Sequence, residues 1–185
     1  MRVHRHTSLV VEVLAALVLL GCGTDPTPAE EPDAGPTNLP GTLTLGTHEQ
    51  GLIDPATFEP FSAGDTAPIV LGSANGAWML VGASRFDALP DGIERVTVRA
   101  SLTDVETGAV YANVVYKLRG LVLEGDAAYL LNQFVVVPDD FSWDGQPALF
   151  SMTWRLEDPP FGEATGSVQV VMARQDPAVL GSAAP

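Results

Sequence analysis

The chain has 185 residues, of which nine are Lys or Arg and 23 are Asp or Glu, so its formal net charge at pH 7 is −14. This excess of acid excludes the nucleic-acid-binding class, because phosphates and an acidic surface repel each other. The one cysteine, Cys22, excludes a disulfide within the chain, so packing alone must hold the fold together.

The first 21 residues have the pattern of a secretory signal peptide. Arg2 and Arg5 make the start basic, and residues 9–20 are apolar except for Glu12. This apolar run is shorter than the ~20 residues that a membrane-spanning helix needs. We therefore expect residues 1–21 to form a signal helix that directs export and is then removed.

The apolar run ends in the tetrapeptide Leu19-Leu20-Gly21-Cys22. This tetrapeptide resembles the lipobox of bacterial lipoproteins. The resemblance implies that the Cys22 thiol carries a diacylglycerol, that the signal is cut just before Cys22, and that the lipid bilayer is a partner through this acylated residue. Two or three acyl chains anchor a protein stably, whereas one chain binds marginally. The alternative is an ordinary signal peptide with a cysteine near its end by chance.

The residue after Cys22 bears on localisation. In the better-known Gram-negative lipoproteins, an aspartate at that position favours the inner membrane. This chain has Gly23 there, and Asp25 comes two residues later. The resemblance therefore implies a lipid-anchored protein of the cell envelope, in the outer membrane of a Gram-negative bacterium.

Residues 22–41 follow as a tether that is rich in proline, acidic and small residues. Leu39 is its only large apolar residue, and a segment that buries so little apolar surface cannot offset the entropy cost of ordering. We expect a disordered, extended spacer, so a chain that begins at Thr42 should be as stable as one that begins at Gly23. Residues 176–185 are expected to form a flexible tail.

Residues 42–175 show the period-two pattern of half-buried strands. Apolar and polar residues alternate over 95–102, 110–118, 148–156 and 167–172. This alternation predicts antiparallel strands with one face on the core and one face in water. The expected fold class is all-β, an antiparallel β-sandwich of immunoglobulin-like architecture without its disulfide, and a closed barrel is the alternative.

Turn signals separate these expected strands. Asn75-Gly76 predicts a two-residue hairpin, and Asp104–Gly108 predicts a turn in which Gly108 has a positive φ. Short helical turns are possible near residues 54–57 and 84–89. Trp154 falls in phase with the apolar residues of its strand and is expected in the core.

Several short segments of the domain share a pattern with other proteins. They are Leu45-Gly46-Thr47, Phe58-Glu59-Pro60, Gly64-Asp65, Pro68–Gly72, Leu102-Thr103-Asp104 and Thr107-Gly108. These segments resemble the opening of small exported lipoprotein domains that are common in myxobacteria and their relatives. That family has no assigned activity, so the resemblance implies a sandwich and an envelope location but no chemistry.

Catalytic signatures are weak in the domain. After the signal peptide the chain keeps one histidine, His48, so a Ser-His-Asp arrangement would have to use it. Neither Ser62 nor Ser73 lies in a nucleophile motif, and a zinc site made of histidine and cysteine is excluded by their number. His48 stands beside Glu49 and is expected in a loop. We expect no enzyme and no cofactor.

The stretch Asp139–Gly145 is the candidate binding site. Asp139, Asp140 and Asp144 offer hard oxygen ligands of the kind that calcium prefers, although their spacing is not that of a helix-loop-helix calcium loop. The alternative is an acidic, solvated hairpin tip. Trp143 lies in the same stretch and is expected to be exposed, where its face could stack on a sugar ring.

These observations favour a lipid-anchored cell-envelope protein with a non-catalytic domain. The domain would be a binding or structural module whose partner is an unknown protein or glycan. The alternative is a carbohydrate- or calcium-binding surface module that uses the Asp139–Gly145 loop. A hydrolase with an unrecognised pair of carboxylates is a third possibility.

Overall fold

The computed structural model describes residues 37–49, 51–72, 76–157 and 161–175. Four features expected from the sequence lie outside these residues: the signal helix at 1–21, the lipidation site Cys22, the first part of the tether and the tail at 176–185. Within the described part the chain is all-β, as the sequence predicts, with one short 3-10 helix beside the strands. No helix of the described part is long and apolar enough to cross a membrane.

Ten strands and the 3-10 helix follow one another along the described chain. The elements are β1 (Leu43–Thr47), η1 (Pro55–Thr57), β2 (Glu59–Pro60), β3 (Asp65–Leu71), β4 (Trp78–Asp87), β5 (Arg95–Asp104), β6 (Val110–Gly120), β7 (Val122–Glu124), β8 (Ala127–Val136), β9 (Pro147–Leu156) and β10 (Gly162–Arg174). The four stretches in which apolar and polar residues alternate fall on β5, β6, β9 and β10.

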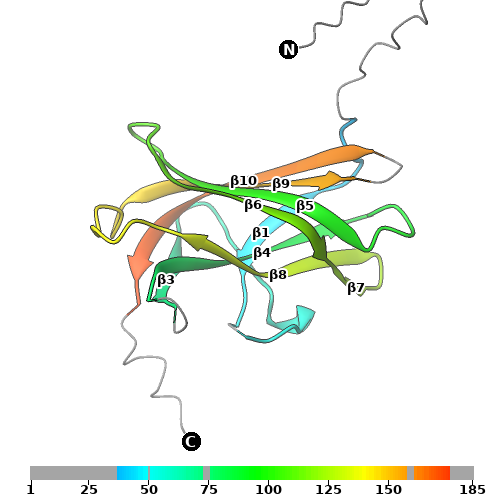
Figure 1. The fold of residues 1–185 in the computed structure, drawn as a ribbon, viewed down its shortest axis with the longest axis horizontal. Coiled ribbons are helices and arrows are strands. Elements are labelled where there is room, and N and C mark those ends of the chain that lie inside the picture. The colour runs from blue at the N-terminus through cyan, green and yellow to red at the C-terminus, as the bar shows by residue number, and fades with distance from the viewer. Residues whose placement is uncertain (1–36, 50, 73–75, 158–160, 176–185) are drawn as a thin grey trace, which may run out of the picture. The chain divides into compact units, whose positions relative to one another are not determined.

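The strands lie in two layers (Figure 1). Hydrogen bonds link them in the order β2-β1-β4-β3-β10-β9-β5-β6, while β8 pairs with β4 and with β7. Strands β10, β9, β5 and β6 form one layer over β1, β4 and β8, and the path passes between the layers where β10 meets β3. No pairing in the described chain joins β6 to β8, so the sheet stays open and the sandwich is confirmed over the closed barrel.

Nearly all neighbouring strands run antiparallel, as predicted. The exception among the named strands is the pair β3 and β10, which are parallel from Asp65 opposite Val170 to Ile69 opposite Arg174. Strand β10 therefore has antiparallel β9 on one edge and parallel β3 on the other. It is the strand through which one layer continues into the other.

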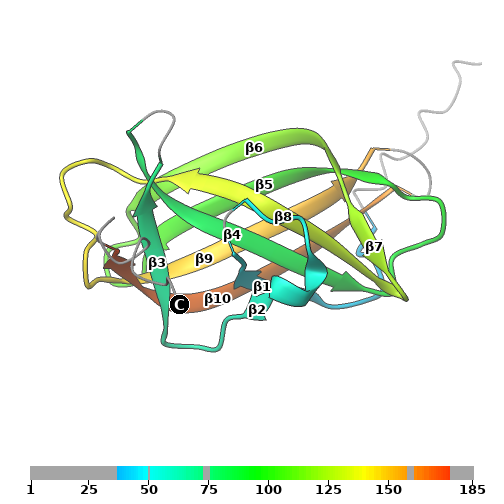
Figure 2. The same ribbon diagram turned by 90° about the horizontal axis from the view of Figure 1, so that it is seen from below.

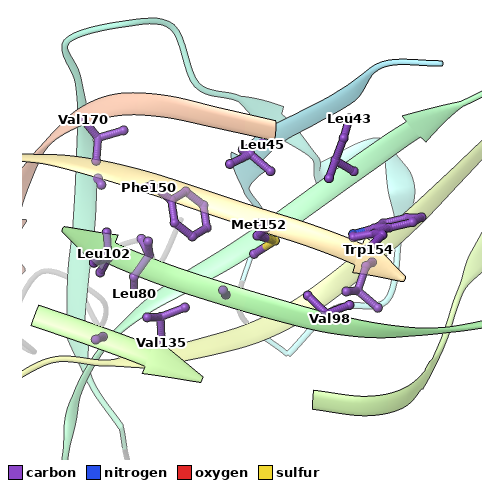
Figure 3. Packing of buried hydrophobic residues seen from close by; sticks show 14 of the residues in the cluster. Leu43, Leu45, Leu80, Val98, Leu102, Val135, Phe150, Met152, Trp154 and Val170 are labelled. Carbon is purple, nitrogen blue, oxygen red and sulfur yellow. The ribbon is translucent and has the colours of Figure 1, made fainter. Parts of the chain in front are cut away.

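The hydrophobic core fills the space between the layers, and Figure 3 shows its buried side chains. Trp154 of β9 is fully buried, which confirms the prediction from its phase. Its indole Nε1 donates a 2.9 Å hydrogen bond to Oγ of Ser84 on β4, which is also fully buried. Because a buried N–H without a partner is costly, this bond satisfies the indole and links the two layers.

The side of β4 and β8 that faces away from the core is apolar as well. Ala83, Tyr129 and Leu131 are buried there in a second cluster, which Phe58 covers. The rings of Phe58 and Tyr129 meet edge to face with their centroids 5.8 Å apart. Figure 2, the view from this side, shows η1 in front of the layer, so residues 48, 49 and 51–61 form a cover over it.

His48 and Asn132 attach this cover to β8. His48 lies in the loop after β1, as the sequence predicts, and is only 6% exposed. Its Nε2 accepts a 2.5 Å hydrogen bond from the N–H of Asn132, so Nδ1 carries the proton and donates to the carbonyl of Glu49 at 2.7 Å. Asn132 has a positive φ of 57°, and its side chain bonds the carbonyl of Leu52 and the N–H of Gly51.

One of the two predicted helical turns is wrong. Residues 55–57 do form a helical turn, which Asp54 caps through a 2.9 Å bond from the N–H of Ala56. Residues 84–87 instead continue β4, because β1 pairs with one edge of this segment and β8 pairs with the other. Two complete ladders outweigh the weak helical preference of four residues.

Residues 37–41, which the sequence assigned to the tether, are docked on the domain. Leu39 donates a 2.9 Å backbone bond to the carbonyl of Glu163, and the N–H of Glu163 donates to the carbonyl of Thr37 at 3.0 Å. The side chain of Leu39 packs against the main core. The sequence boundary at Thr42 is therefore wrong for residues 37–41, because a single leucine and one pair of backbone bonds are enough to dock them.

The turn between β5 and β6 confirms another prediction. Gly108 has the expected positive φ of 72°, and one carboxylate oxygen of Asp104 accepts the N–H groups of Glu106 and Thr107 at 2.9 and 2.6 Å. The other oxygen accepts the hydroxyl of Tyr111 at 2.6 Å. The bond from Tyr111 and those from Thr107 and Glu106 lower the pKa of Asp104 to about 2, and the bond to Asp104 raises the pKa of Tyr111 to about 12.

Candidate functional site

The acidic loop between β8 and β9 does not bring its three aspartates together as ligands. One oxygen of Asp140 accepts the N–H and the hydroxyl of Ser142 at 3.1 and 2.8 Å, and these bonds hold the pKa of Asp140 below its usual value. Asp144 accepts the backbone N–H of Arg174 at 3.0 Å. Across the described residues, no group of three or more His, Cys, Asp or Glu side chains is placed to hold a metal ion.

Trp143 is fully buried, so the expectation of an exposed sugar-stacking ring is wrong. Its Nε1 donates a 2.6 Å hydrogen bond to the carbonyl of Pro138, at the start of the same loop. The ring lies 6.3 Å from Trp78 and 5.9 Å from Phe141, centroid to centroid. A large apolar ring in a loop is driven inward as strongly as one in a strand, and here it anchors the loop to the core.

Arg174 completes this aromatic cluster. Its guanidinium carbon lies 5.0 Å from the ring centroid of Trp78 and 4.9 Å from that of Phe141. Cation–π contacts of this kind stabilise a structure by about 0.5–2 kcal/mol. With the bond from its backbone to Asp144, Arg174 ties the end of β10 to the acidic loop. The loop thus has a structural role, in which it packs against one end of the sandwich.

A different surface has the features of a recognition site. It is the outer face of β10, β9, β5 and β6, where polar side chains stand in register across the strands. We call it the polar face, and it carries the rows Glu163–Arg155–Thr97, Thr165–Thr153–Arg99–Val115 and Ser167–Ser151–Ser101–Asn113. Neighbouring strands are about 4.8 Å apart, so these rows place hydroxyl groups at a regular spacing on a broad sheet.

A shallow cleft of about 360 Å³ lies on the polar face. Three cationic side chains line it, Arg99, Lys117 and Arg155, together with Thr97, Val115, Thr153, Glu157, Glu163 and Thr165. Arg99 is diagonal to Arg155 across β5 and β9, because Thr97 is opposite Arg155 and Arg99 is opposite Thr153. Diagonal neighbours in a sheet are about 7–8 Å apart, so the register places Arg99 and Arg155 close to Thr97.

Two of these cations have no acidic partner in the part of the chain that the structure describes. Arg155 approaches Glu163 at 4.0 Å, which is the outer limit of an ion pair. Arg99 and Lys117 are exposed and form neither an ion pair nor a hydrogen bond within the described residues. Glu157 and Glu163 also line the cleft, so its three cations leave a small local excess of positive charge on a chain with 23 acidic and nine basic residues.

The sequence placed Arg99, Thr97 and Arg155 on solvent-facing sides of their strands but did not bring them together. The alternation reveals which face each residue occupies, whereas the cleft depends on which strands are neighbours. Strands β5 and β9 are adjacent although β6, β7 and β8 lie between them in the chain. A useful signal would have been the concentration of the few basic residues on solvent-facing strand positions.

Comparison with known proteins gives little further guidance. No family model matches the chain, and no curated protein matches it. A solved structure with some likeness is that of the fusolin spindles of Wiseana spp entomopoxvirus, with a TM-score of 0.35 and 12% identity. The match covers 67% of this chain and 48% of that one, so the chain spans about half the length of fusolin. A TM-score at this level carries no inference about function.

Proposed function

We propose that the protein is a lipid-anchored, non-catalytic binding module of the cell envelope, and that the polar face is its binding surface. The observation that carries this proposal is the cleft on that face, where Arg99 and Lys117 are exposed without an acidic partner among the described residues. Charged groups that fold stability does not use are candidates for recognition.

The rest of the described chain supports binding over catalysis. His48, the one histidine after the signal peptide, is buried and both of its ring nitrogens take part in hydrogen bonds that hold the cover on β8. A general base must be able to reach substrate, and His48 cannot do so in this fold. The acidic loop has a structural role, because Asp140 and Asp144 accept hydrogen bonds from Ser142 and Arg174.

The anchor rests on the sequence, through the lipobox at Leu19–Cys22. Its test is the variant Cys22→Ala, expressed in a Gram-negative host and fractionated beside the wild type. We expect the wild type to partition with membranes and to carry acyl mass on Cys22, and the variant to lose both. A variant that still partitions with membranes and matures at the same site would contradict the anchor.

The binding surface is tested with the exported chain made soluble by Cys22→Ala. We expect this chain to co-sediment with envelopes of its source cells, and the double variant Arg99→Gln with Lys117→Gln to lose most of that binding. The matched control is Arg95→Gln with Arg119→Gln, which removes the same charge at exposed positions that do not line the cleft. Equal loss in both double variants would show that net charge alone matters and would contradict the proposal.

A further inference from the structure

The cleft of the polar face also indicates the chemistry of its ligand, an inference that rests on the binding function proposed above. We propose that it binds an acidic polysaccharide, with a sugar carboxylate held among Arg99, Lys117 and Arg155. The three cations line the same cleft as Thr97, which lies opposite Arg155 and two residues before Arg99 on β5, and the carboxylates of Glu157 and Glu163 line it as well. The cleft thus offers an excess of positive charge and a hydroxyl that can form hydrogen bonds.

The charged groups suit a carboxylate. A guanidinium presents N–H donors in a planar fork that matches the two oxygens of a carboxylate, and such charge-assisted bonds are about twice as strong as neutral ones. Arg99 and Lys117 lack an acidic partner in the described chain, so an incoming anion does not have to displace one. Only the weak contact of Arg155 with Glu163 would be exchanged.

The surroundings of the cations suit a sugar polymer. The adjoining row Ser167–Ser151–Ser101–Asn113 crosses four strands and offers short polar groups that can both donate and accept hydrogen bonds, as sugar hydroxyls require. Val115 lines the cleft with 52% of its surface exposed and provides an apolar contact for the C–H face of a sugar ring. These rows extend well beyond the area that one small anion covers, so the ligand is a chain.

The charge of the whole molecule limits the class of polyanion. The net charge of −14 repels any polyanion at a distance, and the repulsion grows with the charge density of the ligand. Double-stranded DNA carries a charge every ~1.7 Å of its axis, whereas a polyuronate carries at most one charge per sugar. A ligand with sparse carboxylates gains the contacts of the cleft and suffers less from the surrounding acid.

Titration with polygalacturonate tests the proposal, using the exported chain with Cys22→Ala. We expect saturable binding by the wild type that weakens as salt is raised, and at least a tenfold weaker dissociation constant in Arg99→Gln with Lys117→Gln. The control Arg95→Gln with Arg119→Gln should stay within about twofold of the wild type. Thermal unfolding of each variant checks that these exposed substitutions leave the fold intact.

Titrations with two other polymers distinguish an acidic polysaccharide from other classes of ligand. A neutral glucan of equal length should bind at least tenfold more weakly than polygalacturonate, and so should a single-stranded oligonucleotide. Absence of polygalacturonate binding, equal binding of the glucan, tighter binding of the oligonucleotide, or equal loss in the two double variants would each overturn the inference. If envelopes still retain the wild type through Arg99 and Lys117 while polygalacturonate does not bind, the binding function stands and the acidic polysaccharide is wrong.

Discussion

The two outer faces of the sandwich differ in the way in which they meet solvent. On β5 and β9, buried apolar residues alternate with exposed or half-buried polar ones, so their outer side is the polar face. On β4, eight of the first nine positions are buried, and β8 is buried over its first five. An outer face that is polar stays open to ligands, whereas an apolar one must be covered by another part of the chain.

The cover over β4 and β8 consists of residues 48, 49 and 51–61. Its large apolar contacts include Phe58 on Tyr129 and Phe61 on Phe150, and hydrogen bonds of His48 and Asn132 attach it to β8. The polar face needs no such cover, because its hydroxyl groups can be hydrated. The covered face serves the fold, whereas the polar face is the one proposed above to bind a partner.

The largest expected effect on the free energy of unfolding comes from an aspartate introduced on the covered face, compared with an aspartate introduced on the polar face. Ala83 of β4 is fully buried beneath the cover, so Ala83→Asp places a carboxylate in an apolar cluster. We expect a loss of about 3 kcal/mol or more in the free energy of unfolding. Chemical denaturation of the purified chain measures it.

Ser151→Asp is the matched control. Ser151 lies on β9 in the middle of the polar face, between Ser101 and Ser167, where a carboxylate remains hydrated. We expect a change within about 0.5 kcal/mol. Similar losses in the two variants would mean that the faces do not differ in the way described.

The second effect concerns the edge of the polar layer. A chain that begins at Thr42 lacks the backbone bonds that Thr37 and Leu39 make with Glu163, and it exposes the core surface that Leu39 covers. Each bond contributes about 1 kcal/mol, so we expect a loss of about 2–3 kcal/mol and a fall in Tm of roughly 5–10 °C relative to a chain that begins at Thr37. Equal Tm values would restore the boundary at Thr42 and show that residues 37–41 are dispensable.

A smaller effect is expected where the cover is attached. Asn132→Ala removes two side-chain hydrogen bonds and places a residue that disfavours positive φ at a φ of 57°. We expect a loss of about 1.5–3 kcal/mol. Asn132→Gly keeps the backbone conformation and should lose less, so the difference between the two variants isolates the cost of the left-handed backbone. A larger loss in the glycine variant would contradict this account.

The smallest effect lies at the β5–β6 turn, at the end of the polar layer. Tyr111→Phe removes the hydroxyl that bonds Asp104, so the pKa of Asp104 should rise from about 2 toward its ordinary value of 3.8. Carbon-detected NMR of the carboxyl group measures this directly. An unchanged pKa would show that the N–H groups of Glu106 and Thr107 alone are responsible.

The sign of the pH dependence follows from the direction of these shifts. The pKa of Asp104 is lowered, so its contribution to stability is present above pH 3.8 and is lost as pH falls toward 2. The pKa of Tyr111 is raised from 10.0, so its contribution is present below pH 10 and is lost as pH rises toward 12. Between pH 4 and pH 2 the wild type should therefore lose more stability than Tyr111→Phe.

The sequence predicted the polar layer better than the covered one. Alternation of apolar and polar residues arises when one face of a strand is exposed to solvent, as on β5 and β9. The sequence therefore identified these strands and their inward-facing residues correctly. The run from Trp78 to Asp87 has no such contrast, because both of its faces are covered. Residues 84–87 were consequently misread as the start of a helical turn.

The binding surface was harder to predict for a different reason. Each of Arg99, Thr97 and Arg155 could be given a face from its own strand, but the cleft exists only because β5 lies beside β9. Trp143 was misjudged because a loop position carries no periodic signal, and its burial depends on the pocket formed by Trp78 and Phe141. Both the cleft and the burial of Trp143 depend on contacts in the folded structure, which the pattern of a single segment does not reveal.

The central position of β10 has a consequence for the order of assembly. This strand is made last among those described, yet it pairs with β9 and with β3, about a hundred residues earlier in the chain. Pairings at such separations form slowly, because a long loop must close first. Until β10 arrives, the edges of both β3 and β9 are unpaired and the two layers are not joined. A fold that is completed by its final strand suits the export proposed above, because the chain would stay unfolded until that strand has emerged.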